Sequence, residues 1–66
     1  MPKQRVIVEE EERLVSLLSR LEMLPKIQSG VLQVFVNGEA ISTSELSIKT
    51  VGPEDLVIVL PVLRGG

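Results

Sequence analysis

Five leucines at helical spacing constrain this chain more than any other feature. They stand at i, i+3, i+4, i+7 and i+10 of one segment: Leu14, Leu17, Leu18, Leu21 and Leu24. This spacing predicts one amphipathic helix from about residue 11 to residue 24, with its apolar stripe facing a core. Pro25 follows directly. Because proline cannot continue a helix and disfavours helical geometry in the residue before it, we expect the helix to end at Leu24.

Four consecutive glutamates, residues 9–12, stand just before the leucine stripe. The simpler interpretation is a charged, solvated segment. If the run enters the first helical turn, its carboxylates also oppose the positive end of the helix dipole.

Runs of β-branched and other apolar residues predict the strands. We expect strands at about residues 4–9, 31–36, 39–41 and 56–60. Asn37-Gly38 is a hairpin signal because both residues accept positive φ. The polar segment 42–50 is expected to cross over irregularly, with one helical turn around residues 44–46, and residues 52–55 to form a turn. Pro61 lacks an amide proton, so we expect regular pairing to weaken beyond Leu60.

The length allows only one small core. Sixty-six residues, 44% of them apolar, suit one domain spanning residues 1–66. One helix and a few short strands leave a two-layer solution, in which the helix packs across one face of a small mixed sheet of three to five strands. The predicted class is therefore α+β, with residues 62–66 as a flexible tail.

Composition excludes several functions. There is no Cys and no His, which excludes a disulfide framework, a usual zinc site, a thiol nucleophile and imidazole catalysis. A net charge of −2 and a single aromatic residue, Phe35, disfavour direct nucleic-acid binding. No apolar run could span a bilayer and the first residues do not resemble a signal peptide, so we expect a cytoplasmic protein that does not bind membranes.

Side chains offer little for catalysis, and we predict that the chain is not an enzyme. The carboxylates outside the glutamate run and the helix lie in turns and strand ends, where solvation is their expected role: Glu39, Glu45, Glu54 and Asp55. The remaining chemistry is the closing Gly65-Gly66. Diglycine can thread a narrow slot, and an ionised terminal carboxylate can attack an ATP α-phosphate held by another protein. The alternative is an end that is glycine-rich by chance.

The C-terminal half resembles the ThiS/MoaD sulfur carriers, which are ubiquitin-like β-grasp proteins. The resemblance covers residues 31–66 and rests on four features in order: V-F-V-N-G-E at residues 34–39, G-P-E-D before the apolar strand, Pro61 just past that strand, and the closing diglycine. Residues 63–66, L-R-G-G, also match the tail of ubiquitin.

The resemblance implies a ubiquitin-like β-grasp fold and a cycle centred on Gly66. An E1-like adenylating enzyme would activate the Gly66 carboxylate with ATP and Mg²⁺, and the carrier itself would bind no cofactor. A desulfurase or rhodanese-type donor would supply persulfide sulfur to give a thiocarboxylate. A biosynthetic enzyme would then accept that sulfur for a thiazole, a dithiolene or a thiolated tRNA base. Leu63, Arg64 and Gly65 would form the tail that carries Gly66.

Two features depart from the family pattern. The family has a β-hairpin before its helix, whereas here only the glutamate run separates the first strand from the leucine stripe. Either the second strand is vestigial, or part of residues 10–15 pairs and the helix starts later. The turn at residues 52–55 also reads Gly-Pro-Glu-Asp where the family more often has Gly-Asp.

Strand alternation places a partner-binding face beside the tail. If Val34, Val36 and their counterparts Val57 and Val59 pack inward, then Phe35, Ile58 and Leu60 point the other way and form an exposed apolar patch: this is the expected docking face. The alternatives are that these residues cover a small core or drive self-association.

Two other functions remain open from the sequence. One is a ubiquitin-like modifier joined through Gly66 to lysines of target proteins, which the Arg64 of the ubiquitin-like tail favours. The other is a non-covalent β-grasp interaction module whose diglycine has no role.

Overall fold

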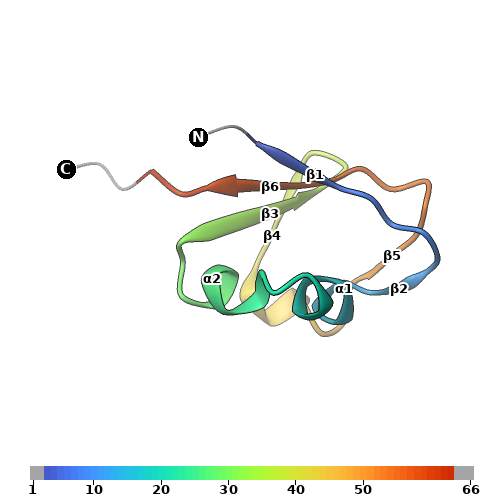
Figure 1. The fold of residues 1–66 in the computed structure, drawn as a ribbon, viewed down its shortest axis with the longest axis horizontal. Helices are drawn as coiled ribbons and strands as arrows, with labels where there is room; N and C mark the ends of the chain where they lie inside the picture. Colours follow the sequence, from blue (N-terminus) through green and yellow to red (C-terminus); the bar gives the residue numbers. More distant parts are fainter. Residues whose placement is uncertain (1–2, 64–66) are drawn as a thin grey trace.

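The computed structural model describes residues 3–63 as two layers, a sheet and the helical segments that cover one of its faces (Figure 1). In chain order the elements are β1 (Gln4–Val6), β2 (Glu12–Arg13), α1 (Leu14–Arg20), α2 (Leu24–Gln28), β3 (Leu32–Val36), β4 (Glu39–Ile41), the 3₁₀ turn η1 (Thr43–Glu45), β5 (Thr50–Val51) and β6 (Val57–Pro61). The chain is therefore α+β, as the sequence predicts.

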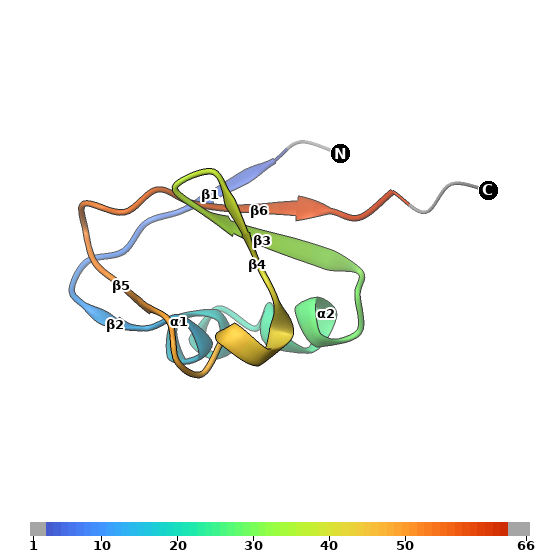
Figure 2. The same ribbon diagram turned by 180° about the vertical axis from the view of Figure 1, so that it is seen from behind.

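The main sheet has four strands in the order β1-β6-β3-β4, and β2 and β5 form a separate two-stranded ribbon. All four strand pairings within residues 3–63 are antiparallel, so the expected mixed sheet is wrong for this part of the chain. The reason is that the first strand lies directly against β6 and runs opposite to it, with Val6 opposite Val57. Figure 2 shows the same sheet from behind, with α1, α2 and η1 all on one side of it.

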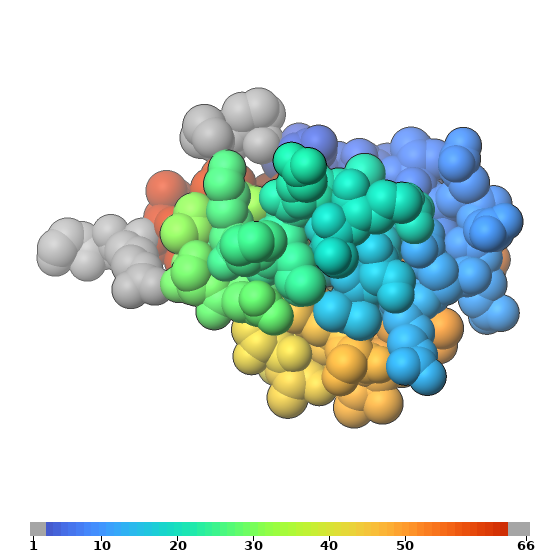
Figure 3. All heavy atoms as spheres, turned by 60° about the horizontal axis from the view of Figure 1, so that its bottom comes forward, coloured from blue at the N-terminus to red at the C-terminus, as the bar shows by residue number. Residues whose placement is uncertain are grey.

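The core lies between the sheet and the helices. Its buried members are all apolar and come from every layer: Val6, Val8, Leu14, Leu17, Leu18, Ile27, Val34, Val36, Ile41, Leu46, Val51, Val57 and Val59. No buried side-chain nitrogen or oxygen lacks a hydrogen-bond partner among the residues described. Figure 3 shows the surface formed by the helical segments, where α1, α2 and the segment around η1 lie side by side. The side chains buried between the two layers are therefore all apolar, and their burial favours the packing of helices on sheet.

The single helix expected over residues 11–24 is instead two short helices. α1 ends at Arg20, and the chain turns through Glu22, which has a φ of 62°. α2 then begins at Leu24, with Pro25 in its first turn. Proline is tolerated there because a first-turn amide has no partner within its helix. Pro25 therefore starts a helix rather than ending one, and residues 26–28 after it are helical.

The start of α1 is fixed by contacts distant in sequence. The first two helical amides donate outside the helix: Leu14 N to Lys49 O at 2.8 Å and Val15 N to Leu46 O at 2.9 Å. No side chain caps this end and no acidic residue lies in the first turn, so the glutamate run does not enter the helix. Glu12 pairs in β2, opposite Val51, which confirms the alternative in which part of residues 10–15 pairs and the helix starts later.

A paired charge joins the ribbon to the helix. Arg20 donates two hydrogen bonds to the Glu12 carboxylate, at 2.7 and 2.8 Å. These bonds lower the pKa of Glu12, and the same contact raises the pKa of Arg20. The run is thus not uniformly a solvated segment, because its last member is tied to α1.

The leucine stripe is buried only in part. Leu14, Leu17 and Leu18 are in the core, and Leu24 packs against it from α2. Leu21 is 43% exposed because α1 has already ended at the preceding residue. The first strand is also shorter than expected, at Gln4–Val6 rather than residues 4–9.

The hairpin confirms the sequence analysis, and the crossover does so in part, because Thr50 is not irregular but pairs with Arg13 in β5. Asn37 and Gly38 have φ values of 53° and 85° and join β3 to β4 as a two-residue turn. The expected helical turn near residues 44–46 is η1, one residue earlier.

Contrary to the expectation from the sequence, Pro61 does not interrupt the sheet. It lies in β6 opposite Leu32, and Val62 N still donates to Val31 O at 3.0 Å. In an antiparallel pair, successive residues direct their backbone groups to opposite sides. The missing amide proton of Pro61 therefore faces away from β3, and no β3–β6 hydrogen bond is lost.

Candidate partner-binding face and tail

The outer face of the sheet, away from the helices, is built by strand alternation on β3 and β6. Val34, Val36, Val57 and Val59 are buried beneath it, as predicted. Their neighbours therefore point outward. On this face Phe35 lies directly opposite Ile58.

The three expected docking residues are brought together. In the register of β3 and β6, Leu60 lies opposite Gln33, one outward position along from the pair of Phe35 and Ile58. All three apolar side chains are half-buried rather than fully exposed. Neighbouring side chains on one sheet face are close enough to touch, so much of their area is shielded by the patch itself.

The outward-facing residues of β3 and β6 have neighbours on the two outer strands, β1 and β4. Ile58 is opposite Arg5 on β1, and Phe35 is opposite Ala40 on β4. One straight row across the sheet is therefore Arg5, Ile58, Phe35 and Ala40. Sequence reasoning missed Arg5 and Ala40, because their place on this face depends on which strands are neighbours.

The apolar patch is longer than the sequence analysis predicts. Leu56 and Val62 share the alternation of Ile58 and Leu60, and both are exposed. Ile7 follows β1 and is 67% exposed. The alternation of residues 56, 58, 60 and 62 was a signal that could have found the two members from the β6 segment. We call the surface formed by Phe35, Leu56, Ile58, Leu60 and Val62 the outer patch.

The tail leaves the fold at the end of the outer patch. Val62 is still held by its hydrogen bond to Val31 O, but the next residue, Leu63, is 94% exposed. The expected tail and reaction residues Arg64, Gly65 and Gly66 lie outside the described residues. The last position that the structure describes is thus an exposed side chain next to an apolar face.

A hydrogen-bonded clamp fixes the other end of β6. The Asn37 side chain donates from Nδ2 to Asp55 Oδ1 at 2.9 Å and accepts at Oδ1 from Leu56 N at 2.9 Å. The second Asp55 oxygen accepts from Gly52 N at 2.8 Å. The bonds from Asn37 and Gly52 hold the pKa of Asp55 below its usual value. The clamp joins the hairpin to the turn and so fixes where the outer patch begins.

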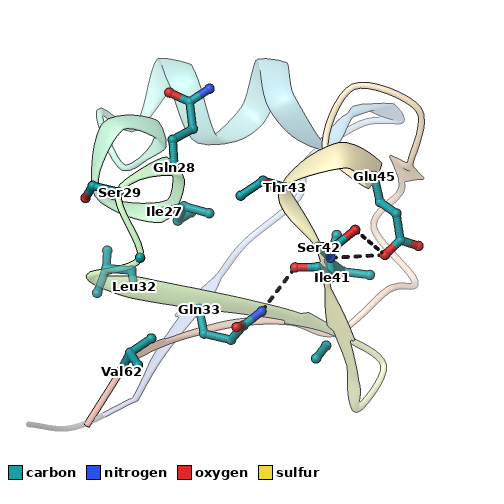
Figure 4. A pocket seen from close by; sticks show the side chains of 12 residues that line it. Ile27, Gln28, Ser29, Leu32, Gln33, Ile41, Ser42, Thr43, Glu45 and Val62 are labelled. Atoms are coloured by element: carbon teal, nitrogen blue, oxygen red, sulfur yellow. Dashed lines mark hydrogen bonds between the residues drawn. The ribbon is translucent and has the colours of Figure 1, made fainter. Parts of the chain in front are cut away.

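A groove opens beside β4, with a volume of about 550 Å³. It lies between the end of α2, the start of β3 and η1, and Figure 4 shows Ile27, Leu32 and Val62 around it with Gln33. Gln33 Nε2 donates to Ile41 O at 3.1 Å, at the point where β4 ends.

Two of the four turn carboxylates are engaged in holding local structure. Glu45 accepts from Ser42 N at 3.0 Å and from Ser42 Oγ at 2.9 Å, which closes the capping box of η1 and lowers the pKa of Glu45. Asp55 belongs to the clamp. Among residues 3–63, no group of three or more acidic side chains is placed to hold a metal ion.

Comparisons with protein-family models, with curated proteins and with solved structures find no match to this chain. In the part of the chain that the structure describes, no helix has the length and apolar character needed to cross a membrane.

Proposed function

We propose that this chain is a sulfur carrier of the ubiquitin-like β-grasp type, with the Gly66 carboxylate as its reacting group. The observation that carries the proposal is the arrangement at the end of β6. The strand that bears the outer patch runs directly into the exposed Leu63, three residues before Gly66. A partner that covers the patch is therefore placed to receive the tail. The sequence features shared with the ThiS/MoaD carriers support the same function.

The chemistry falls on the main-chain terminus. A Gly66 carboxylate oxygen attacks the ATP α-phosphorus on an E1-like enzyme, and pyrophosphate leaves with the Mg²⁺ that the enzyme holds. The terminal sulfur of a persulfide donor then attacks the acyl carbon and releases AMP, which leaves an acyl disulfide. A second thiol cleaves that disulfide, giving the thiocarboxylate and a protein disulfide. The carrier supplies no side chain to these steps.

Intact-mass measurement tests the proposal. The chain ending at Gly66 is incubated with the E1-like enzyme encoded in the same genome, ATP, Mg²⁺ and a persulfide donor. We expect a mass change that corresponds to one oxygen replaced by sulfur, and no change when Gly65-Gly66 is replaced by Ala-Ala. Absence of adenylation and of sulfur incorporation, with an enzyme shown to be active on another carrier, contradicts the proposal.

The docking role of the outer patch has its own test. Phe35→Ala and Ile58→Asp should each raise the concentration of carrier needed for half-maximal ATP–pyrophosphate exchange. Ile48→Asp is the matched control because Ile48 is 76% exposed and lies between η1 and β5, outside the sheet. Equal effects of Ile58→Asp and Ile48→Asp would show that the outer patch does not contact the activating enzyme.

A ubiquitin-like modifier is the second candidate, favoured by Leu63-Arg64-Gly65-Gly66. Both functions begin with the same acyl-adenylate. The modifier predicts conjugates of higher mass in cells that disappear when Gly66 is deleted, whereas the sulfur carrier predicts an endogenous thiocarboxylate. A non-covalent interaction module instead predicts that partner binding survives the change of Gly65-Gly66 to Ala-Ala.

A further inference from the structure

β1 presents an unpaired backbone edge. The order β1-β6-β3-β4 makes β1 an outer strand, and no other strand within residues 3–63 pairs with it. An outer strand leaves a row of amides and carbonyls available to another chain.

The register shows which backbone groups these are. Val62, which follows β6, donates from its amide to Val31 O on the β3 side. Backbone groups alternate in direction along a strand, so the odd-numbered Val57 directs its own toward β1, where it faces Val6. By the same alternation, Arg5 directs its amide and carbonyl away from the sheet. The odd-numbered residues of this segment therefore form its open side.

The open side continues past β1 as far as Glu9. Exposure alternates residue by residue as in a strand, with Arg5, Ile7 and Glu9 exposed and Val6 and Val8 buried. The described residues form no backbone hydrogen bond with the amide or carbonyl of Ile7 or Glu9. Val6 and Val8 belong to the core and hold the segment in place, so the three exposed residues form one accessible row.

The side chains of this row differ in charge. Arg5 is an exposed cation, Ile7 is 67% exposed, and Glu9 is an exposed carboxylate. The only salt bridge within residues 3–63 joins Arg20 to Glu12. The charge of Glu9 contributes to the raised pKa of Arg20, but both hydrogen bonds of that guanidinium go to Glu12. The row is thus positive, apolar and negative in turn.

This order is complementary to itself when the strand is reversed. In an antiparallel pair of two copies centred on Ile7, Arg5 of each copy lies opposite Glu9 of the other, and the two Ile7 side chains lie opposite each other. Opposite charges and apolar side chains that face each other across strands are stabilising. The odd-numbered backbone groups face the second copy in this register, so each facing pair exchanges main-chain hydrogen bonds in both directions.

Neighbouring registers lack this match. A pair centred on Arg5 or on Glu9 places two like charges directly opposite each other, which is destabilising. A pair centred on Val6 places Ile7 opposite Arg5, and a pair centred on Val8 places Ile7 opposite Glu9. Of these registers, the one centred on Ile7 alone joins opposite charges and keeps the apolar residue against an apolar residue.

We propose that two copies of this chain associate through β1, in an antiparallel pair centred on Ile7. Main-chain hydrogen bonds supply the attachment, and the two facing pairs of Arg5 and Glu9 select the register. The second copy is thus the occupant that the charges of the edge fit.

The pair joins two four-stranded sheets edge to edge. Its twofold axis is perpendicular to the sheet, so the outer patches of both copies face the same side. Extending the register of β1 and β6 places Leu56, which is 41% exposed, beside Ile7. The two β6 strands run in opposite directions, so the tails leave at opposite ends of the joined sheet. The association does not involve the tail chemistry and stands whether or not Gly66 carries sulfur.

Charge reversal tests the pairing. Sedimentation velocity of the full chain at low salt, from micromolar to millimolar concentration, should show a reversible equilibrium between monomer and dimer. Arg5→Glu and Glu9→Arg should each raise the dissociation constant of the dimer at least about threefold, because each change creates two facing pairs of like charge by symmetry. The double variant restores opposite charges and should return the constant to within about twofold of the original value.

Two controls separate the edge from other effects. Lys26→Glu makes the same change in net charge as Arg5→Glu, at an exposed residue of α2 in the helical layer. It should leave the dissociation constant unchanged. Replacement of Gly65-Gly66 by Ala-Ala should also leave it unchanged, because the tail is not part of the pair.

Intermolecular nuclear Overhauser effects give the register without any variant. In the proposed pair, Val6 of one copy lies opposite Val8 of the other as a pair without mutual hydrogen bonds, the kind in which the Cα atoms lie closest. In an equimolar mixture of ¹³C-labelled and unlabelled chain, we expect a contact between the Hα of Val6 in one copy and the Hα of Val8 in the other.

Four results would overturn the proposal. The first two are a chain that stays monomeric at millimolar concentration and a dimer weakened equally by Arg5→Glu and Lys26→Glu. The others are a double variant that dimerises no more tightly than the single variants and intermolecular contacts centred on β4 or Phe35. None of these measurements involves the activating enzyme, so failure here leaves the proposed function standing.

Discussion

Two helix ends of the same geometry, one with glutamate and one with glycine, allow a paired test of backbone strain. After α1, Glu22 N donates to Ser19 O at 3.0 Å and Met23 N to Leu18 O at 2.9 Å. This is the Schellman pattern, which requires a left-handed residue after the helix cap. Glu22 adopts it with a φ of 62°.

The second helix ends in the same way with the preferred residue. Gly30 N donates to Ile27 O at 3.2 Å and Val31 N to Lys26 O at 2.8 Å. Gly30 has a φ of 85°. The two ends thus share one set of hydrogen bonds and differ in whether a Cβ must be accommodated in the left-handed region.

The perturbation is Glu22→Gly. Removing the Cβ relieves about 1–2 kcal/mol of left-handed strain, and the added freedom of the unfolded chain offsets about 0.5–1 kcal/mol of that gain. The expected net stabilisation is about 0.5–1 kcal/mol, or a rise in Tm of about 2–8 °C for a domain of this size. Gly30→Ala should lower stability by about 1 kcal/mol, because it introduces the same strain.

The assay is circular dichroism in the far ultraviolet, followed with urea and with temperature. The chain has no Trp and no Tyr, so intrinsic fluorescence gives little signal. Glu22→Gln is the control because it removes the negative charge near the C-terminal end of α1 but keeps the Cβ. A Glu22→Gly variant no more stable than Glu22→Gln would refute the strain argument and assign any gain to the helix dipole.

Three further predictions concern the core and two of the three carboxylates with lowered pKa values. Leu18→Ala should cost about 2–5 kcal/mol in urea unfolding, because Leu18 is fully buried. Asp55→Asn should lower Tm at neutral pH but not in strong acid. The pKa of Asp55 is lower in the folded state than in the unfolded state, so its carboxylate stabilises the fold above the unfolded pKa near 3.9. That stabilisation is lost as pH falls through the folded pKa. Glu12→Gln should follow the same pH pattern, and high salt should weaken its effect because the pair with Arg20 is on the surface. Thermal melts across pH and salt check both; a destabilisation of either variant that persists unchanged in strong acid would contradict the linkage.

The sequence by itself determined the features that depend on neighbouring residues. Asn37-Gly38 specified its hairpin because both residues tolerate positive φ, and this fixed the pairing of Val36 with Glu39. Alternation in residues 31–36 and 56–60 separated the buried valines from Phe35, Ile58 and Leu60, since successive side chains of a strand point to opposite faces.

Only the tertiary structure decided the features that depend on distant segments. The sequence did not show that α1 begins where Lys49 O and Leu46 O accept its first amides, nor that Pro25 would open a helix. It also did not show that β1 would lie antiparallel to β6 and place Arg5 beside Ile58. The physical reason is that a backbone donor or a strand edge is satisfied equally well by many partners, and the packing of the whole core selects among them.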